Sequence, residues 1–177
     1  MAEQFEFELV YALPAGDHDA FELSDAVFEA GYHDAIVGSG DPRLLAVELE
    51  VVGEDAKAVI LNAARAILKN LPKGTELREV RPDLVSLADV AERLEVRRQA
   101  LQQRPMPPAV AGGLYRITEL AEVIKSFAQP EPGGRRARMN FERANGWLRA
   151  GSAATALNAK ITLRELNPVF LEEKQQS

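Results

Sequence analysis

The chain has 177 residues, of which 46% are hydrophobic and 27% are charged, a composition typical of a globular protein with one or two domains. It contains no cysteine, which excludes disulfide bonds and thiolate metal sites. No apolar run is long enough to span a bilayer, and the first residues lack the basic and apolar regions of a signal peptide. We therefore expect a cytoplasmic protein without membrane contact.

The net charge of −6 is unevenly distributed along the chain. Residues 1–81 carry 16 acidic and 7 basic side chains, residues 82–127 carry six of each, and residues 128–177 carry 5 acidic and 8 basic. An acidic first part and a basic last part indicate modules with different functions, so the overall charge does not exclude binding to nucleic acid. We expect three segments, with boundaries at residues 1–81, 82–128 and 129–177.

The first segment has the hydrophobic pattern of alternating strands and helices. Apolar and acidic residues alternate from Phe5 to Tyr11, as in a half-buried strand. Helices are expected over residues 20–30 and 54–69, and further strands over residues 33–37, 44–51 and 75–81. This order predicts an α+β protein that begins with a ferredoxin-like βαββαβ sandwich, in which both helices cover one face of the sheet.

Four glutamates of the two central strands are expected on the open face of this sheet, namely Glu6, Glu8, Glu48 and Glu50. An RNA-binding sheet needs aromatic side chains and positive charge on that face, so RNA binding is disfavoured. Alternating glutamates usually form a solvated face, and a subunit or partner-protein interface is favoured over a divalent-metal site. We predict no metal and no cofactor.

The second segment begins with two short helices. Ser86 and Asp89 form an S-x-x-D capping box that predicts a helix from residue 87, with Val90 and Leu94 on its buried side. After the corner at residues 94–96, a second helix is expected to open at Arg97. It would expose Arg97, Arg98, Gln99, Gln102 and Gln103. Arginine pairs with guanine and glutamine with adenine, so these side chains are suited to reading purine edges.

The stretch LVSLADVAERLEVRRQAL resembles the opening of the helix-turn-helix in MerR-like and excisionase-like winged DNA-binding domains, and PPAVAGGLYRITELAEVI resembles their wing. The wing would be a hairpin around residues 112–113, a return strand over residues 114–117 and a helix capped by Thr118. The resemblance implies double-stranded DNA binding, with the second helix in the major groove. This chain has Glu95 where the corner usually holds glycine, and Pro105 and Pro107 shorten the second helix.

Further basic residues lie outside this helix. Arg116 on the expected wing strand could contact a phosphate or pair with Glu119. The cluster Arg135, Arg136 and Arg138 could add phosphate contacts from a flexible arm, or interact with the acidic first segment. The third segment is expected to hold helical residues 139–150 and 152–160, separated by Gly151, with Trp147 as a packing anchor.

These features favour a bacterial transcriptional regulator that binds specific double-stranded DNA. We expect a homodimer, because one shortened recognition helix reads too few base pairs. One alternative is a protein-interaction module, such as an antitoxin or phage-defence accessory protein, whose winged helix has lost its DNA contacts. Another is a small-molecule sensor of the ACT kind. We find no catalytic motif, and His18 and His33 lack the spacing of metal ligands, so no enzyme activity is expected.

Overall fold

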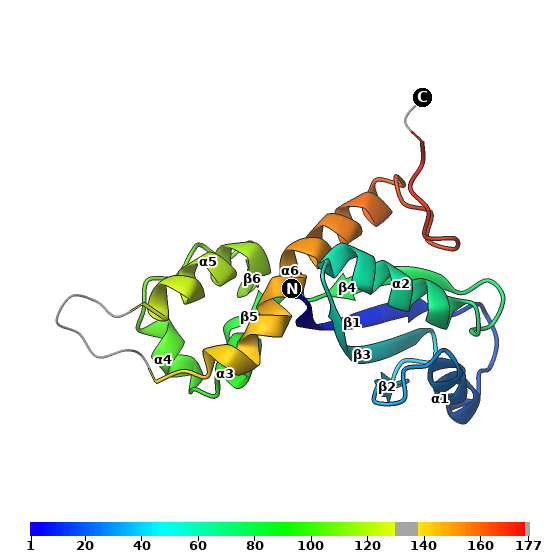
Figure 1. Ribbon diagram of the computed structural model, residues 1–177, viewed down its shortest axis with the longest axis horizontal. Coiled ribbons are helices and arrows are strands. Elements are labelled where there is room, and N and C mark those ends of the chain that lie inside the picture. Colours follow the sequence, from blue (N-terminus) through cyan, green and yellow to red (C-terminus); the bar gives the residue numbers. More distant parts are fainter. Residues whose placement is uncertain (130–137, 176–177) are drawn as a thin grey trace.

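The computed structural model describes residues 1–129 and 138–175. Within these residues the protein is of mixed α+β class, with six helices and two antiparallel sheets. Figure 1 shows a sheet with two helices at one end, a group of short helices at the other, and α6 (Phe141–Thr162) crossing between them. We call residues 3–81 the sheet module and residues 84–127 the helical module.

The sheet module contains four strands and two helices: β1 (Glu3–Ala12), α1 (Ala20–Glu29), β2 (Ile36–Gly38), β3 (Leu44–Gly53), α2 (Ala56–Leu68) and β4 (Glu76–Arg81). Its strands lie in the order β2-β3-β1-β4, and all neighbours are antiparallel. Both expected helices are present, and their starts are fixed by the side chains of Asp19 and Asp55, which accept backbone N–H bonds as N-caps. The strand expected from residue 33 begins only at Ile36, because residues 31–35 form a turn.

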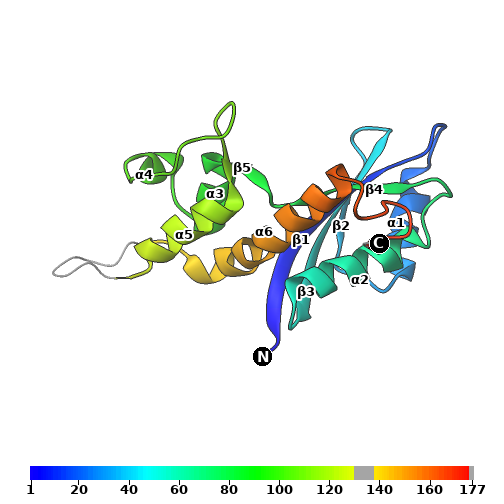
Figure 2. The same ribbon diagram turned by 90° about the horizontal axis from the view of Figure 1, so that it is seen from above.

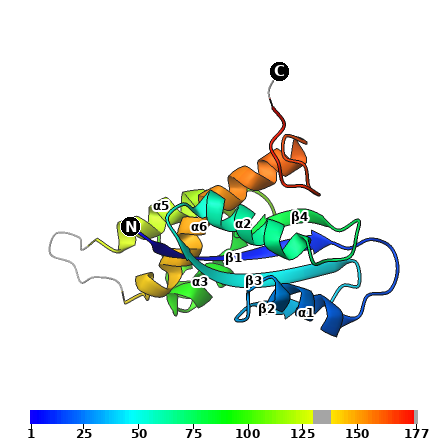
Figure 3. The same ribbon diagram turned by 45° about the vertical axis from the view of Figure 1, so that its right-hand side comes forward.

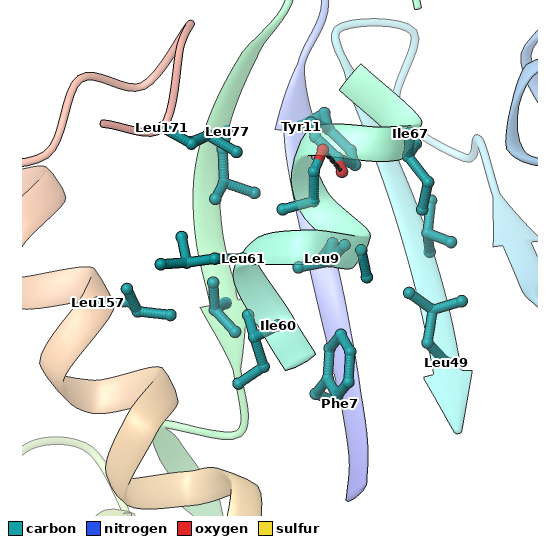
Figure 4. Close-up of a cluster of buried hydrophobic side chains, with 14 of the residues drawn as sticks. Phe7, Leu9, Tyr11, Leu49, Ile60, Leu61, Ile67, Leu77, Leu157 and Leu171 are labelled. Carbon is teal, nitrogen blue, oxygen red and sulfur yellow. Dashed lines mark hydrogen bonds between the residues drawn. The ribbon is translucent and has the colours of Figure 1, made fainter. Parts of the chain in front are cut away.

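The core of the sheet module lies between the sheet and its helices. Phe5, Phe7, Leu9 and Tyr11 of β1 are buried on the side that α2 covers, and Leu49 of β3 lies beside them (Figure 4). The Tyr11 hydroxyl donates a hydrogen bond of 3.0 Å to the carbonyl oxygen of Ala64 in α2. Burial of this phenol raises the pKa of Tyr11 well above its usual value. The period-2 pattern of β1 therefore faces the helices as expected.

The helical module consists of two strand–helix units and one short helix: β5 (Leu84–Ser86), α3 (Leu87–Leu94), α4 (Arg98–Gln102), β6 (Leu114–Arg116) and α5 (Ile117–Phe127). The two strands pair antiparallel, with Val85 opposite Tyr115. The expected return strand thus pairs mainly with β5, while only an isolated bridge joins Ala111 to Leu114. Helix α5 has Arg116 at its N-cap position, so the expected cap at Thr118 is wrong by two residues.

The expected break at Gly151 is also wrong, since α6 is one helix of 22 residues. A Cβ atom at Gly151 would lie 2.6 Å from Cγ1 of Ile117, and one at Gly146 would lie 2.7 Å from the carbonyl oxygen of Gln4. Both distances are shorter than real contacts. These glycines let α6 approach a helix of one module and a strand of the other, and they do not interrupt it.

Helix α6 contributes side chains to both hydrophobic cores. Trp147 belongs to the core of the helical module, as expected of a packing anchor, and Leu157 belongs to the core of the sheet module. Asn158 also covers the edge of the sheet at β4, because its amide accepts from the N–H of Val80 at 2.8 Å and donates to the carbonyl oxygen of Val80 at 2.7 Å. Strand β4 is therefore covered at its outer edge by α6 at Val80 and by the chain that follows α6 at Leu77, whose N–H donates to the carbonyl oxygen of Pro168 at 2.9 Å.

Candidate nucleic-acid interface

The start of α3 is fixed by the capping box expected from the sequence. The Ser86 hydroxyl accepts a bond of 3.2 Å from the N–H of Asp89, and the Asp89 carboxylate accepts one of 2.8 Å from the N–H of Ser86. Val90 and Leu94 are buried, as their spacing predicted, and Ala91 is buried beside them. Helix α3 therefore provides a firm base for the corner that follows.

Glu95 occupies this corner in the left-handed region, with φ 56° and ψ 42°, a conformation that favours glycine. Its carboxylate accepts hydrogen bonds from the Asn140 side chain at 2.9 Å and from Arg143 at 2.8 Å, both near the start of α6. These bonds lower the pKa of the Glu95 carboxyl. Hydrogen bonds from distant residues thus stabilise a left-handed corner that would otherwise favour glycine.

Helix α4 is short but anchored at two points. Leu101 is fully buried in the helical core, and the Arg104 guanidinium lies 4.7 Å from the ring centroid of Phe127. The helix begins at Arg98, one residue later than expected, and Arg97 stands at its N-cap position. Arg104, which follows the helix, therefore contributes to packing.

The five side chains that the sequence predicts for base contacts are all exposed: Arg97, Arg98, Gln99, Gln102 and Gln103. We call them the α4 surface. None of them is joined by a hydrogen bond or ion pair to another residue within 1–129 or 138–175. Helix α4 lies at the outer end of the helical module, away from the sheet (Figure 2).

A groove of about 440 Å³ separates α4 from the turn before β6. Arg98 and Gln102 line one side of it, and Gly113 and Tyr115 line the other. Arg98 and Gln102 thus form the wall of a groove that is open to solvent. Arg98 and Gln102 therefore share this groove with the start of β6.

The other predicted contacts lie elsewhere. Arg116 neighbours Tyr115 on a strand whose side chains alternate, so it points away from the α4 groove and pairs with Glu119 at 3.5 Å. Arg138 is exposed before the start of α6. Arg135 and Arg136 lie outside the described residues.

The glutamates expected on an open sheet face are largely paired. We call Glu6, Glu8, Glu48 and Glu50 the carboxylate face. Glu8 forms an ion pair of 2.9 Å with Arg81, and Gln4 donates to Glu50 at 2.7 Å. The solvated face expected from the alternation is therefore only partly open.

Arg93 of α3 joins the helical module to this face. Its guanidinium pairs with Glu6 and, at 3.3 Å, with Glu48, and it lies 5.2 Å from the ring centroid of Trp147. The sequence gives no signal for this contact, because Arg93 and Glu48 are 45 residues apart and belong to different modules. This contact holds α3 against the sheet module.

The pKa of Glu48 is raised by burial and by the nearby carboxylates Glu8, Glu92 and Glu50. The pKa of Arg93 is lowered by burial and by Arg143. Both pKa values are thus shifted toward the neutral form, first by burial and then by like charges: carboxylates around Glu48 and Arg143 beside Arg93. The ionised Glu48 is therefore a source of local repulsion.

We expect the Glu48→Gln variant to be slightly more stable than the parent at neutral pH, by less than about 1 kcal/mol, because the group is partly exposed. A carboxyl whose pKa is raised on folding destabilises the fold while it is ionised. The advantage of the variant is thus complete above the raised pKa and is lost as the pH falls toward the ordinary glutamate value of about 4.3. Urea unfolding at neutral and acidic pH measures this, with Glu54→Gln on an exposed turn as the control. If Glu48→Gln were stabilised more at acidic than at neutral pH, the raised pKa of Glu48 would be contradicted.

Among residues 1–129 and 138–175, no group of three histidine, aspartate or glutamate side chains is placed to hold a metal ion. In the same part of the chain, no helix has the length and apolarity that crossing a membrane requires. Protein-family models, curated proteins and solved structures were compared with the chain, and none of them matches it.

Proposed function

We propose that this protein is a sequence-specific double-stranded DNA-binding protein, a cytoplasmic transcriptional regulator in which α4 enters the major groove. The observation that carries the proposal is the α4 surface, where two arginines and three glutamines stand exposed on a helix packed across α3. A buried helix face would carry apolar side chains instead. A surface used only for solubility has no need of a helix held at the end of the molecule by a capping box, a strained corner and an arginine–aromatic contact.

The fold that we propose for the two modules is a ferredoxin-like sandwich followed by a winged helix-turn-helix. The sandwich is supported by the strand order β2-β3-β1-β4 with two helices on one face. The winged helix-turn-helix is supported by the succession of α3, α4 and the β5–β6 pair. In such domains the second helix makes base contacts mainly through its N-terminal residues, here Arg97 to Gln99.

The chemistry of the α4 surface matches base readout. Arginine forms two hydrogen bonds with the O6 and N7 acceptors of guanine, and glutamine forms two with N6 and N7 of adenine. Five helical residues cover only a few base pairs, so we propose that two copies bind together. Phosphate contacts from Arg138 and from other basic side chains would add affinity without sequence preference.

Selection of bound sequences from a random DNA pool tests the proposal directly. We expect enrichment of a defined motif by the parent protein, and loss of at least about a hundredfold in affinity for that motif in the Arg97→Ala/Arg98→Ala variant. The matched control is Arg43→Ala/Arg78→Ala, which removes two exposed arginines from the sheet module and should leave affinity nearly unchanged.

Affinity measurements at several salt concentrations, on the enriched motif and on random DNA, separate specific from nonspecific binding. Affinity for the enriched motif should fall steeply with salt, whereas the preference for the motif over random DNA should be lost only in the α4 variant. If no motif is enriched, or if the α4 variant binds the motif as well as the parent, the proposed role of α4 is wrong.

A further inference from the structure

A groove of about 650 Å³ lies between the end of α2 and the chain that follows α6, at the end of the molecule opposite to α4. We call it the α2 groove. Leu68, Leu71 and Pro72 form one wall, and Val169 and Phe170 form the other. Phe170 exposes 68% of its surface, which is unusual for a ring beside a concave apolar site. The groove is therefore an apolar surface without an occupant in the single chain.

The rim of the α2 groove is basic. Lys69 and Lys73 line it, both are exposed, and neither forms an ion pair with any described residue. Arg65 also lines the groove, but its guanidinium donates to the carbonyl oxygen of Leu171 and holds the far wall in place. The one acidic side chain at the rim is Glu172. An occupant of this groove should combine an aromatic side chain with carboxylates.

The outer face of α1 has this combination. Phe21 exposes 82% of its surface, and Phe28 lies seven residues later on the same side of the helix, with Asp25 between them. Glu22 and Glu29 flank this face, and α1 contains no basic residue. This exposed helix surface is complementary to the α2 groove, because it offers an aromatic ring to the apolar walls and carboxylates to the basic rim.

The two surfaces lie at the same end of the sheet module. The turn that follows α2 approaches the loop that leads into α1, where a Cβ atom at Gly74 would lie 3.4 Å from Cβ of Pro14. The side chain of Asn70 donates to the carbonyl oxygen of Ala26 in α1 at 3.2 Å. Figure 3 shows α1 and α2 together beside the sheet, and Figure 1 shows both at the end of the molecule away from α4. Because Phe21 is exposed, it does not fill the groove of its own chain.

We propose that a second copy of this chain is the occupant, so that two chains associate head to head around a two-fold axis. The Phe21 ring of each copy lies in the α2 groove of the other, and Glu22 and Asp25 face Lys69 and Lys73. A two-fold contact uses each pair of complementary patches twice. This inference names a surface for the proposed homodimer but does not depend on DNA binding, and the contact leaves both α4 surfaces uncovered.

Charge reversal with full-length chains in the absence of DNA tests the proposal. The parent should form a concentration-dependent dimer in sedimentation velocity, and Phe21→Ser should weaken it by about tenfold or more. Glu22→Lys/Asp25→Lys and Lys69→Glu/Lys73→Glu should each be monomeric alone, because like charges meet at both contacts. An equal mixture of these two variants should dimerise again, since each contact then joins opposite charges.

The mixture makes the result independent of folding defects, because two misfolded chains would not restore association. Lys125→Glu on α5, at the other end of the molecule, is the control and should leave the dimer unchanged. A parent that is monomeric at all concentrations, a dimer that both reversals leave intact, or a mixture that stays monomeric would each overturn the proposal.

Discussion

Replacement of Trp147 by alanine is expected to lower the free energy of unfolding by about 3–5 kcal/mol. The Trp147 side chain is 6% exposed and belongs to the core of the helical module, and the Arg93 guanidinium rests on its ring. The substitution therefore removes a large buried surface and also leaves Arg93 without its aromatic contact. Chemical unfolding followed by circular dichroism measures the loss.

The control for this prediction is Leu163→Ala at the end of α6, where the leucine is 66% exposed. We expect that variant to lie within about 0.5 kcal/mol of the parent, as is usual for exposed positions. A Trp147→Ala protein as stable as the Leu163→Ala protein would show that the helical core is not organised around this indole.

The Asn158→Leu variant is expected to lose about 2–4 kcal/mol of stability, although leucine has nearly the same size. The asparagine amide bonds both backbone groups of Val80 and also donates to the Asp83 carboxylate at 2.9 Å. Leucine would leave these groups without partners at the edge of the sheet. Because β4 is an outer strand, its edge at Val80 would also be open to pairing with other chains.

Hydrogen exchange gives a second, local measure of the same change. The Val80 amide should exchange faster in Asn158→Leu by more than the change in global stability accounts for. Ala156→Leu places the same new side chain on the exposed side of α6 and should alter neither quantity. Unchanged protection of Val80 would mean that another group covers the β4 edge.

Elements with strong local signals were predictable from the sequence. Asp19 marks the start of α1 and the pair Ser86 and Asp89 marks that of α3, because a capping side chain acts only on its own next turn. Helix α2 was expected from residue 54 but begins at Ala56, after its N-cap Asp55. The exposure of the α4 surface was also expected from the sequence, and the buried Leu101 lies on the other side of the helix. These features depend on residues within one or two helical turns of each other.

Features that depend on distant residues could not be predicted. Gly151 has a low intrinsic helix propensity and suggested a break, but its position in α6 is decided by the side chain of Ile117. The corner at Glu95 depends on Asn140 and Arg143, and the covering of the carboxylate face depends on Arg93. Single-sequence periodicity contains no information on such pairs, since neither partner changes the local pattern of the other.

The way α6 is shared between the two cores has a consequence for biosynthesis. Strand β4 and the helical module leave the ribosome well before Trp147 and Leu157, the α6 side chains that close their cores. Until then, the nascent chain carries an uncovered strand edge and an incomplete hydrophobic cluster, both of which are surfaces that chaperones bind and that promote aggregation. The junction at Arg81 and Pro82 is for this reason a poor place to cut the protein into fragments, since each piece would need the same helix.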